Sequence, residues 1–350
     1  MKRVNTKSVK VGNIYIGGSN RITVQSMTNT DTRNIEDTVN QILKLEEEGC
    51  DIVRCAVPDE EAADAIKTIV NRIHIPLVAD IHFDYRLALK SIENGVSALR
   101  INPGNIGNVD KVKAVAKAAR EKNIPIRIGV NSGSLEKNLL NKYKKVCADA
   151  LVESALNHVN ILENINFDDI VISIKSSNVM MMIDSYRKIS EKIAYPLHVG
   201  VTEAGTVWRG TIKSSVGIGT LLCEGIGDTI RVSLTGDPAE EIRVGKEILR
   251  AAGYLSKGIQ FISCPTCGRT QIDLIKIAQE VEERLRNCDK NIKVAVMGCV
   301  VNGPGEAREA DIGIAGGKGE GLIFKKGKVI KKVREDLLVE ELIKEINKLD

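Results

Sequence analysis

Eight short β-type segments, each followed by a helical segment, are the feature of this sequence that most restricts its fold. The segments between them, such as IEDTVNQILKLEEEG, carry apolar residues at helical spacing and charged residues on the other face. Strands that alternate with helices pair in parallel through right-handed crossovers, so the pattern predicts an α/β fold. The β-type segments lie at 22–27, 51–57, 76–83, 98–104, 125–131, 169–177, 197–205 and 229–236.

Eight parallel strands can close into a TIM (β/α)8 barrel or form an open, doubly wound sheet. An open sheet that binds a dinucleotide would carry GxGxxG after its first strand, and no such motif follows residues 22–27. We therefore expect a barrel over residues 1–255, with YLSKGIQ as a linker after the helix that follows Pro238. Residues 256–350 are too few for a second barrel, and their pattern predicts a small α/β domain.

Composition argues against several classes of protein. With 43% hydrophobic and 27% charged residues the chain has the composition of an ordinary soluble globular protein, and a net charge of +4 is too small to indicate a nucleic-acid binder. Aromatic residues make up 3%, too few for a base-stacking surface. The sequence has no apolar run near the roughly 18 residues of a membrane helix, and its start lacks the apolar centre of a signal peptide. A cytoplasmic protein with reduced cysteines is expected.

Polar side chains occupy the ends of the predicted strands, where a parallel barrel carries its active site. Spacing of i, i+2 along a strand puts two side chains on one side of the sheet, and three such pairs occur. A single arginine among them could simply extend its head to solvent. The set comprises Gln25, Arg54, Asp80, His82, Arg100, Asn102, Arg127, Asn131, Lys175, Glu203, Arg231 and Ser233.

The cations of this set favour an anionic substrate. They come from five different strands: Arg54, Arg100, Arg127, Lys175 and Arg231. If they converge at one face with only Asp80 and Glu203 among them, they repel one another unless an anion lies between them. Arginine forks suit phosphate oxygens. The barrel mouth is therefore predicted to bind a small, highly anionic molecule, and the number of cations favours a diphosphate over a monophosphate.

Three cysteines of the second domain predict a metal centre. Cys264 and Cys267 form a C-x-x-C, and Cys299 follows 32 residues later, before a Gly-Pro-Gly turn. A structural zinc site would show a further cysteine or histidine close to Cys299, and the sequence has none there. A redox C-x-x-C would need a thioredoxin-like context and would leave Cys299 unexplained. The spacing favours an iron–sulfur cluster, with zinc as the alternative.

Glu306 is the candidate for the fourth ligand. It lies seven residues past Cys299, beyond a turn that brings the chain back on itself. A carboxylate is a harder ligand than a thiolate, so it would be the labile one, and its departure would open one iron to substrate. The other cysteines are expected to be packing residues or bystanders: Cys50, Cys55, Cys147, Cys223 and Cys288.

Six motifs together resemble the bacterial hydroxymethylbutenyl diphosphate synthase family of the methylerythritol phosphate isoprenoid pathway. They are CPTCGR, MGCVVNGPGEA, VQSMTNTDT, LRINPGNIG, RIGVNSGSLE and EGIGDTIRVSLTG, and the resemblance runs from about residue 5 to the C-terminus. It implies a barrel followed by a small domain that holds a [4Fe–4S] cluster through Cys264, Cys267, Cys299 and Glu306. It also implies reductive opening and dehydration of methylerythritol cyclodiphosphate, with electrons from flavodoxin or ferredoxin.

The resemblance further implies roles for individual residues. Those that would hold the cyclic diphosphate are Arg54, Arg100, Arg127, Asn131 and Lys175, with His82 and Ser233 as further candidates. Glu224, in CEGIGDT, is implied to lie near the substrate as a proton donor for the departing hydroxyl. Spacing alone would make Glu224 a carboxylate at a helix end. The family forms homodimers in which one subunit's cluster domain faces the other's barrel mouth.

Two functions of other classes compete with this interpretation. The first is a redox-inert barrel synthase for a pterin or a phosphosugar, with a structural zinc domain. The second is a non-catalytic iron–sulfur carrier or an RNA-binding module, which the low aromatic content and the polar barrel mouth disfavour.

Overall fold

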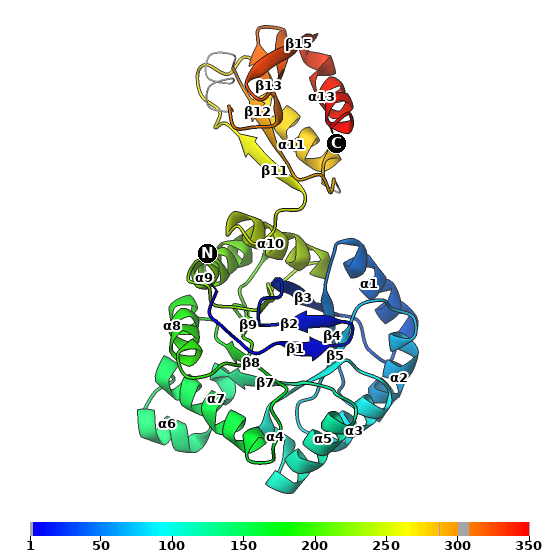
Figure 1. Cartoon of the computed structure of the whole chain (residues 1–350), viewed down its shortest axis with the longest axis vertical. Coiled ribbons are helices and arrows are strands. Elements are labelled where there is room, and N and C mark those ends of the chain that lie inside the picture. Colours follow the sequence, from blue (N-terminus) through cyan, green and yellow to red (C-terminus); the bar gives the residue numbers. More distant parts are fainter. Residues whose placement is uncertain (1–2, 287, 300–307, 350) are drawn as a thin grey trace. The chain divides into compact units, whose positions relative to one another are not determined.

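The computed structural model describes residues 3–286, 288–299 and 308–349. The chain divides into two compact units, Met1–Tyr254 and Leu255–Asp350 (Figure 1). Among the described residues, no helix combines the length and the apolarity that crossing a bilayer requires.

The first unit is a TIM (β/α)8 barrel, as predicted. All neighbouring strands pair in parallel, in the order β8-β7-β6-β5-β4-β3-β10-β9. A bridge from Ile172 to Leu197 joins β8 to the chain just before β9 and closes the ring. The strands are β3 (Thr23–Met27), β4 (Ile52–Ala56), β5 (Leu77–Asp80), β6 (Ala98–Ile101), β7 (Ile126–Asn131), β8 (Ile170–Lys175), β9 (His198–Val199) and β10 (Thr229–Ile230).

Helices surround this ring of strands (Figure 1). Each long helix buries one apolar stripe, as in α1, where Val39, Ile42 and Leu45 face the sheet side and the Asn34 side chain caps the N-terminus. The barrel helices are α1 (Ile35–Glu47), α2 (Glu60–Val70), α3 (Tyr85–Glu93), α4 (Pro103–Ile106), α5 (Val109–Glu121), α6 (Lys137–Tyr143), α7 (Ala148–Glu163), α8 (Val179–Ser190), α9 (Val207–Cys223) and α10 (Pro238–Ala251).

An N-terminal hairpin, which the sequence analysis did not assign, covers one end of the barrel. Its strands β1 (Val9–Val11) and β2 (Ile14–Ile16) pair antiparallel. Their apolar side chains pack against residues at the start of four barrel strands: Ile52, Val78, Ala98 and Val171. The hairpin therefore covers the N-terminal end of the strands (Figure 1), and the opposite end of the barrel is its mouth.

The ring is closed by a side chain as well as by backbone pairing. The Tyr186 hydroxyl, from α8, accepts a hydrogen bond from the Ile174 backbone N–H at 2.9 Å and donates one to the His198 backbone oxygen. Tyr186 is fully buried. This hydroxyl thus joins β8 to β9, where the strand pairing is shortest.

The second unit is a five-stranded mixed sheet with two helices. The strands are β11 (Ile259–Ser263), β12 (Ile292–Met297), β13 (Ile312–Gly317), β14 (Glu320–Lys325) and β15 (Lys328–Arg334). The first three strands pair in parallel, and β14 and β15 pair antiparallel as a hairpin. The helices α11 (Leu274–Arg284) and α13 (Leu338–Asn347) bury their apolar faces in one core with β12 and β13.

We predict that Tyr186→Phe lowers the stability of the barrel by about 1–3 kcal/mol, because it leaves a buried N–H and a buried carbonyl without their partner. Urea unfolding should show the loss as a lower midpoint. Tyr15→Phe is the matched control, since Tyr15 is 49% exposed on β2. An unchanged midpoint in Tyr186→Phe would show that the hydroxyl does not help to close the ring.

Candidate active site

One buried carboxylate lies among the cations inside the barrel. Asp80, at the end of β5, accepts a hydrogen bond from Arg100 Nη1 at 3.1 Å through Oδ1. Its other oxygen lies 3.5 Å from Arg54 Nε. The exposed fractions of Arg54, Asp80 and Arg100 are 2%, 3% and 4%. The one carboxylate of Asp80, on β5, therefore interacts with two guanidinium groups, one from each of the neighbouring strands β4 and β6.

The charge balance of this cluster is incomplete. Burial by itself would raise the pKa of Asp80, but Arg54, the nearby His82 side chain and Arg100 hold it well below its usual range. Burial, and then repulsion from Arg54 and Arg100, lowers the pKa of Arg127. A guanidinium nevertheless keeps its proton at neutral pH. The cluster therefore carries excess positive charge in a region shielded from water.

Several of the buried guanidinium groups also have unused donors. Within the described part of the chain, Arg100 Nε, Arg127 Nε and Nη2, and Arg231 Nε are buried and make no hydrogen bond. Leaving charged donors buried and unpaired is costly, so such groups normally meet a partner. Phosphate oxygens fit both the charge and the fork geometry of these groups. The cluster has the features of an anion site.

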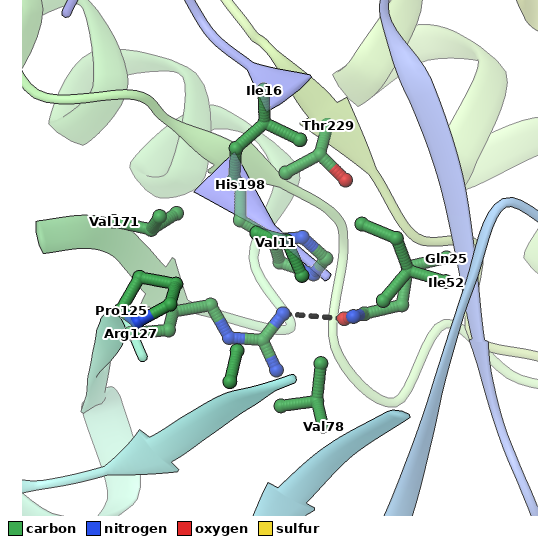
Figure 2. Close-up of a pocket in the computed structure, with 11 residues that line it drawn as sticks. Val11, Ile16, Gln25, Ile52, Val78, Pro125, Arg127, Val171, His198 and Thr229 are labelled. Carbon is green, nitrogen blue, oxygen red and sulfur yellow. Dashed lines mark hydrogen bonds between the residues drawn. The ribbon is translucent and has the colours of Figure 1, made fainter. Parts of the chain in front are cut away.

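Arg127 lies deeper in the barrel than predicted. It is the second residue of β7 rather than one of the last, because the strand runs on to Asn131. Its Nη1 donates to Gln25 Oε1 on β3, as Figure 2 shows. Below this pair, a cavity of about 20 Å³, room for about one water molecule, extends to the apolar side chains of the N-terminal hairpin. Arg127 therefore forms the floor of the cation cluster.

Gly129 on β7 makes room for Arg100. A Cβ at this position would come within 2.5 Å of Arg100 Nη2 and 2.8 Å of its Cζ. The guanidinium therefore lies directly against the backbone of the neighbouring strand. Glycine is needed here for close approach, since Gly129 does not have the positive φ angle that would by itself favour glycine.

The rim of the mouth carries the remaining predicted residues. Lys175 and Asn131 end β8 and β7 and are partners in the strand register. Asn131 Oδ1 accepts from the Gly133 N–H at 3.0 Å and orders the loop after β7. His82 is 57% exposed, and its Nε2 lies 3.7 Å from Asp80 Oδ2. Ser233 is half-buried, three residues past the end of β10.

The sequence analysis missed Glu241, a buried carboxylate on α10. It is 5% exposed and accepts hydrogen bonds from Ser26 Oγ at 2.8 Å and the Leu234 N–H at 3.0 Å. Arg231 Nη2 lies 3.6 Å away. Arg231 is thus partly neutralised, unlike Arg127. The helical period could have revealed Glu241, because it falls on the same face as the buried Gly245 and Ile248.

Glu224 does not lie among the cations of the barrel, where the resemblance would place it. It caps the C-terminal end of α9, and Arg187 Nε donates to its carboxylate at 2.9 Å. The neighbouring Gly225 carbonyl accepts from the Val4 N–H, in the segment that leads into the N-terminal hairpin. A helix that returns to the start of the next strand ends at the closed side of the barrel. Glu224 and the mouth residues therefore cannot contact the same small ligand within one chain.

Glu203 is the glutamate at the mouth. It follows β9, at the end of the barrel where Asn131 and Lys175 lie. Its φ of 54° is unusual for a residue other than glycine, and such backbone strain concentrates at functional sites. Its exposed carboxylate makes no hydrogen bond or ion pair with the described residues.

In the second unit, the two cysteine-bearing loops lie side by side. The Gly298 N–H donates to Cys264 Sγ at 3.2 Å, and the Gln271 N–H donates to the Gly298 carbonyl at 3.0 Å. A Cβ at Gly298 would meet Thr270 at 3.0 Å, so the loops are in close contact. Gly298, the residue before Cys299, therefore lies against the segment that follows the C-x-x-C.

The thiols differ in their surroundings. Cys267 is exposed, and hydrogen bonds from the backbone and then the side chain of Arg269 lower the pKa of its thiol, which favours the thiolate.

In the described ranges, no group of three or more cysteine, histidine or acidic side chains is gathered as a metal site would be. The predicted ligand Glu306 lies outside those ranges. The donor set of three soft thiols from adjoining loops fits an iron–sulfur cluster.

The remaining cysteines fit the prediction of packing residues unevenly. Cys50 and Cys55 are buried, and burial raises the pKa of their thiols to about 12 and about 11. Cys147 and Cys288 are half-buried, and Cys223 is exposed.

Two family descriptions match this chain. Residues 6–246 match the GcpE TIM-barrel domain, and residues 260–348 match the GcpE protein C-terminal domain. Among curated relatives, the 4-hydroxy-3-methylbut-2-en-1-yl diphosphate synthase (flavodoxin) of Clostridium acetobutylicum is 73% identical and covers all of both chains. Proteins of the same name from Clostridium perfringens and Caldanaerobacter subterraneus are 76% and 65% identical, covering 98% of this chain and 99% and 97% of theirs.

Solved structures share the barrel fold at low identity. A dihydropteroate synthase from Stenotrophomonas maltophilia is 14% identical with a TM-score of 0.52, covering 71% of this chain and 99% of its own. An N-acetylneuraminic acid synthetase from Leptospira borgpetersenii is 12% identical with a TM-score of 0.51, covering 80% of this chain and 98% of its own. These similarities concern the fold alone.

We predict that Gly129→Ala weakens the binding of inorganic pyrophosphate by roughly tenfold, about 1.4 kcal/mol, because the added methyl group displaces the Arg100 guanidinium. Titration calorimetry measures the change. Gly219→Ala is the matched control, since Gly219 lies on α9 with open space at its Cβ position. Equal affinity in the two variants would contradict a role for Gly129 in placing Arg100.

Proposed function

The chain belongs to the GcpE family, and from this premise we propose that it converts 2-C-methyl-D-erythritol 2,4-cyclodiphosphate to 4-hydroxy-3-methylbut-2-enyl diphosphate in isoprenoid precursor biosynthesis. The reaction opens the ring reductively and removes a hydroxyl as water. Relatives 73% and 76% identical over nearly their whole length carry the name of this synthase. The observation in the molecule that carries the proposal is the under-neutralised cation cluster, whose free donors suit a cyclic diphosphate.

In this proposal the barrel residues bind and orient the substrate. Arg54 and Arg100 hold the phosphates from the side, with Asp80 fixing the direction of both guanidinium groups. Arg127 binds from below through donors that are unused in the barrel. Lys175 and Asn131 contact the diphosphate at the rim, where His82 and Ser233 are further candidates. The buried positions exclude water, which strengthens each of these interactions.

We further propose that a [4Fe–4S] cluster is held by Cys264, Cys267 and Cys299, with Glu306 as the fourth ligand. Support comes from the contact between the two thiol-bearing loops and from the thiolate-favouring surroundings of Cys267. When bound, the cluster would supply the two electrons and act as a Lewis acid toward the substrate oxygen.

The partners of the reaction follow from the relatives and the resemblance. We propose flavodoxin as the electron donor, because the names of the relatives include it, with ferredoxin as the alternative. A homodimer in which each cluster domain serves the partner's barrel belongs to the same proposal. The cytoplasm is the proposed location, which agrees with eight cysteines that form no disulfide.

A proton must accompany the departing hydroxyl, and we propose Glu203 rather than Glu224 as its donor. Glu203 has an exposed, unpaired carboxylate at the end of β9. Glu224 is paired with Arg187 at the closed end of the barrel.

The proposed function is tested with protein prepared without oxygen. We expect iron and sulfide in the protein, and turnover of the cyclodiphosphate with reduced flavodoxin. Arg54→Ala should keep the iron and sulfide but lose roughly 10–100-fold in substrate affinity, because a charged hydrogen-bond donor is removed from a buried site. Cys267→Ser should lose the cluster but not substrate binding. Zinc in place of iron and sulfide would instead support the redox-inert synthase.

The choice between the two glutamates has its own test. We predict that Glu203→Gln lowers kcat by roughly 10²–10⁴-fold, the usual contribution of a general acid, with little change in substrate affinity. Glu224→Gln should instead cost a surface ion pair and leave turnover near the wild-type value. The opposite pattern of losses would restore Glu224 as the proton donor.

A further inference from the structure

Lys175 differs from the other cations of the barrel in having no partner. Its ammonium group makes no hydrogen bond and no ion pair with any described residue, although it is half-buried at the end of β8. Arg54 and Arg100 share Asp80, and Arg231 lies near Glu241. The cluster thus has more positive charges than its carboxylates can neutralise: Arg127 meets only the neutral Gln25, and Lys175 meets no partner among the described residues.

The groups around Lys175 make its charge unfavourable. Burial first, and then the positive charges of Arg54 and Arg100, lower the pKa of Lys175 to about 6, although the nearby Asp80 acts in the opposite direction. Arg127 on β7 acts in the same direction. The arginines cannot relieve the repulsion by losing a proton, since their pKa values are too high. Lysine can.

Other titratable groups lie on the elements that pack against β8, and at the mouth. On β9, burial lowers the pKa of His198 well below its usual value, so this side chain is neutral. On α8, the hydroxyl of Tyr186 is engaged in two hydrogen bonds, and burial raises its pKa well above its usual value. On α7, His158 Nε2 lies 2.9 Å from Glu136 Oε1. His82 and Glu203 lie at the mouth.

We propose that Lys175 is neutral in the ligand-free barrel at neutral pH and takes up a proton from solvent when the cyclic diphosphate binds. The inference rests on the proposed function and adds a proton-linked step to substrate recognition. An anion among the cations replaces the repulsion at Lys175 by attraction, and the protonated ammonium gains the partner that it lacks in the free protein.

This device suits the charge change of the reaction. When the ring carbon–oxygen bond breaks, its electron pair stays on the phosphate oxygen, so the diphosphate gains one negative charge. The two electrons come from the electron donor, and the hydroxyl leaves with a proton as water. Lys175 does not give up its proton in these steps. Its ammonium group is positively charged when the more anionic product forms. Lys175 can release the proton to solvent after the product has left.

The experiment is titration calorimetry of the whole, anaerobically prepared protein with the cyclodiphosphate in the absence of reductant. Two buffers of the same pH, about 7.5, and of different ionisation enthalpies report the protons taken up. We expect uptake of about one proton per barrel, falling toward zero below pH 6, where Lys175 is already charged. Wild-type protein that binds without uptake would overturn the inference and leave the proposed function standing. Absence of binding would contradict both.

Variants identify the group that takes up the proton. Lys175→Arg carries a fixed charge, so it should bind the ligand without uptake, and Lys175→Met should bind more weakly and also without uptake. His82→Asn should still take up the proton, as should the surface control Lys192→Arg. Uptake that persists in either Lys175 variant, or that disappears in His82→Asn, would assign the proton to another group and overturn the inference.

Discussion

The pairing of one buried carboxylate with several cations is the interaction on which the rest of this molecule depends. Asp80 holds Arg54 and Arg100 in fixed positions but cannot neutralise them together with Arg127 and Lys175. If carboxylates neutralised all of these cations, the cluster would be stable but would not attract an anion. If none were neutralised, the cations would repel one another and the side chains would move apart. The intermediate balance keeps the guanidinium groups ordered and still attractive to an anion.

The barrel around the cluster holds the cationic side chains in place although they repel one another. The hairpin of β1 and β2 closes one end with apolar side chains, and the Tyr186 hydroxyl completes the ring between β8 and β9. Gly129 allows Arg100 to lie against β7 without displacing the strand. Because the strands cannot separate, the charges can be relieved only by a ligand that enters at the mouth or by loss of a proton.

The two units contribute different chemistry. The barrel supplies fixed positive charge, which suits the diphosphate of the proposed function, whereas the second unit carries soft thiols, with Gly298, next to Cys299, hydrogen-bonded to Cys264. A thiol-bound redox centre and an oxygen-rich anion need different surroundings, so their separation into two units is chemically reasonable.

The sequence by itself determined the eight-stranded barrel, the second domain, the cluster of cations and the C-x-x-C, because periodicity, charge and short spacings are local properties. Only the tertiary structure decided the depth of Arg127, the burial of Glu241 beside Arg231, and the separation of Glu224 from Glu203. Each of these depends on where a strand or helix ends and on which distant residue it meets. Glu203 and Glu224 are both carboxylates near predicted element ends, and only the direction of the chain through the barrel places one at the mouth and the other at the closed end.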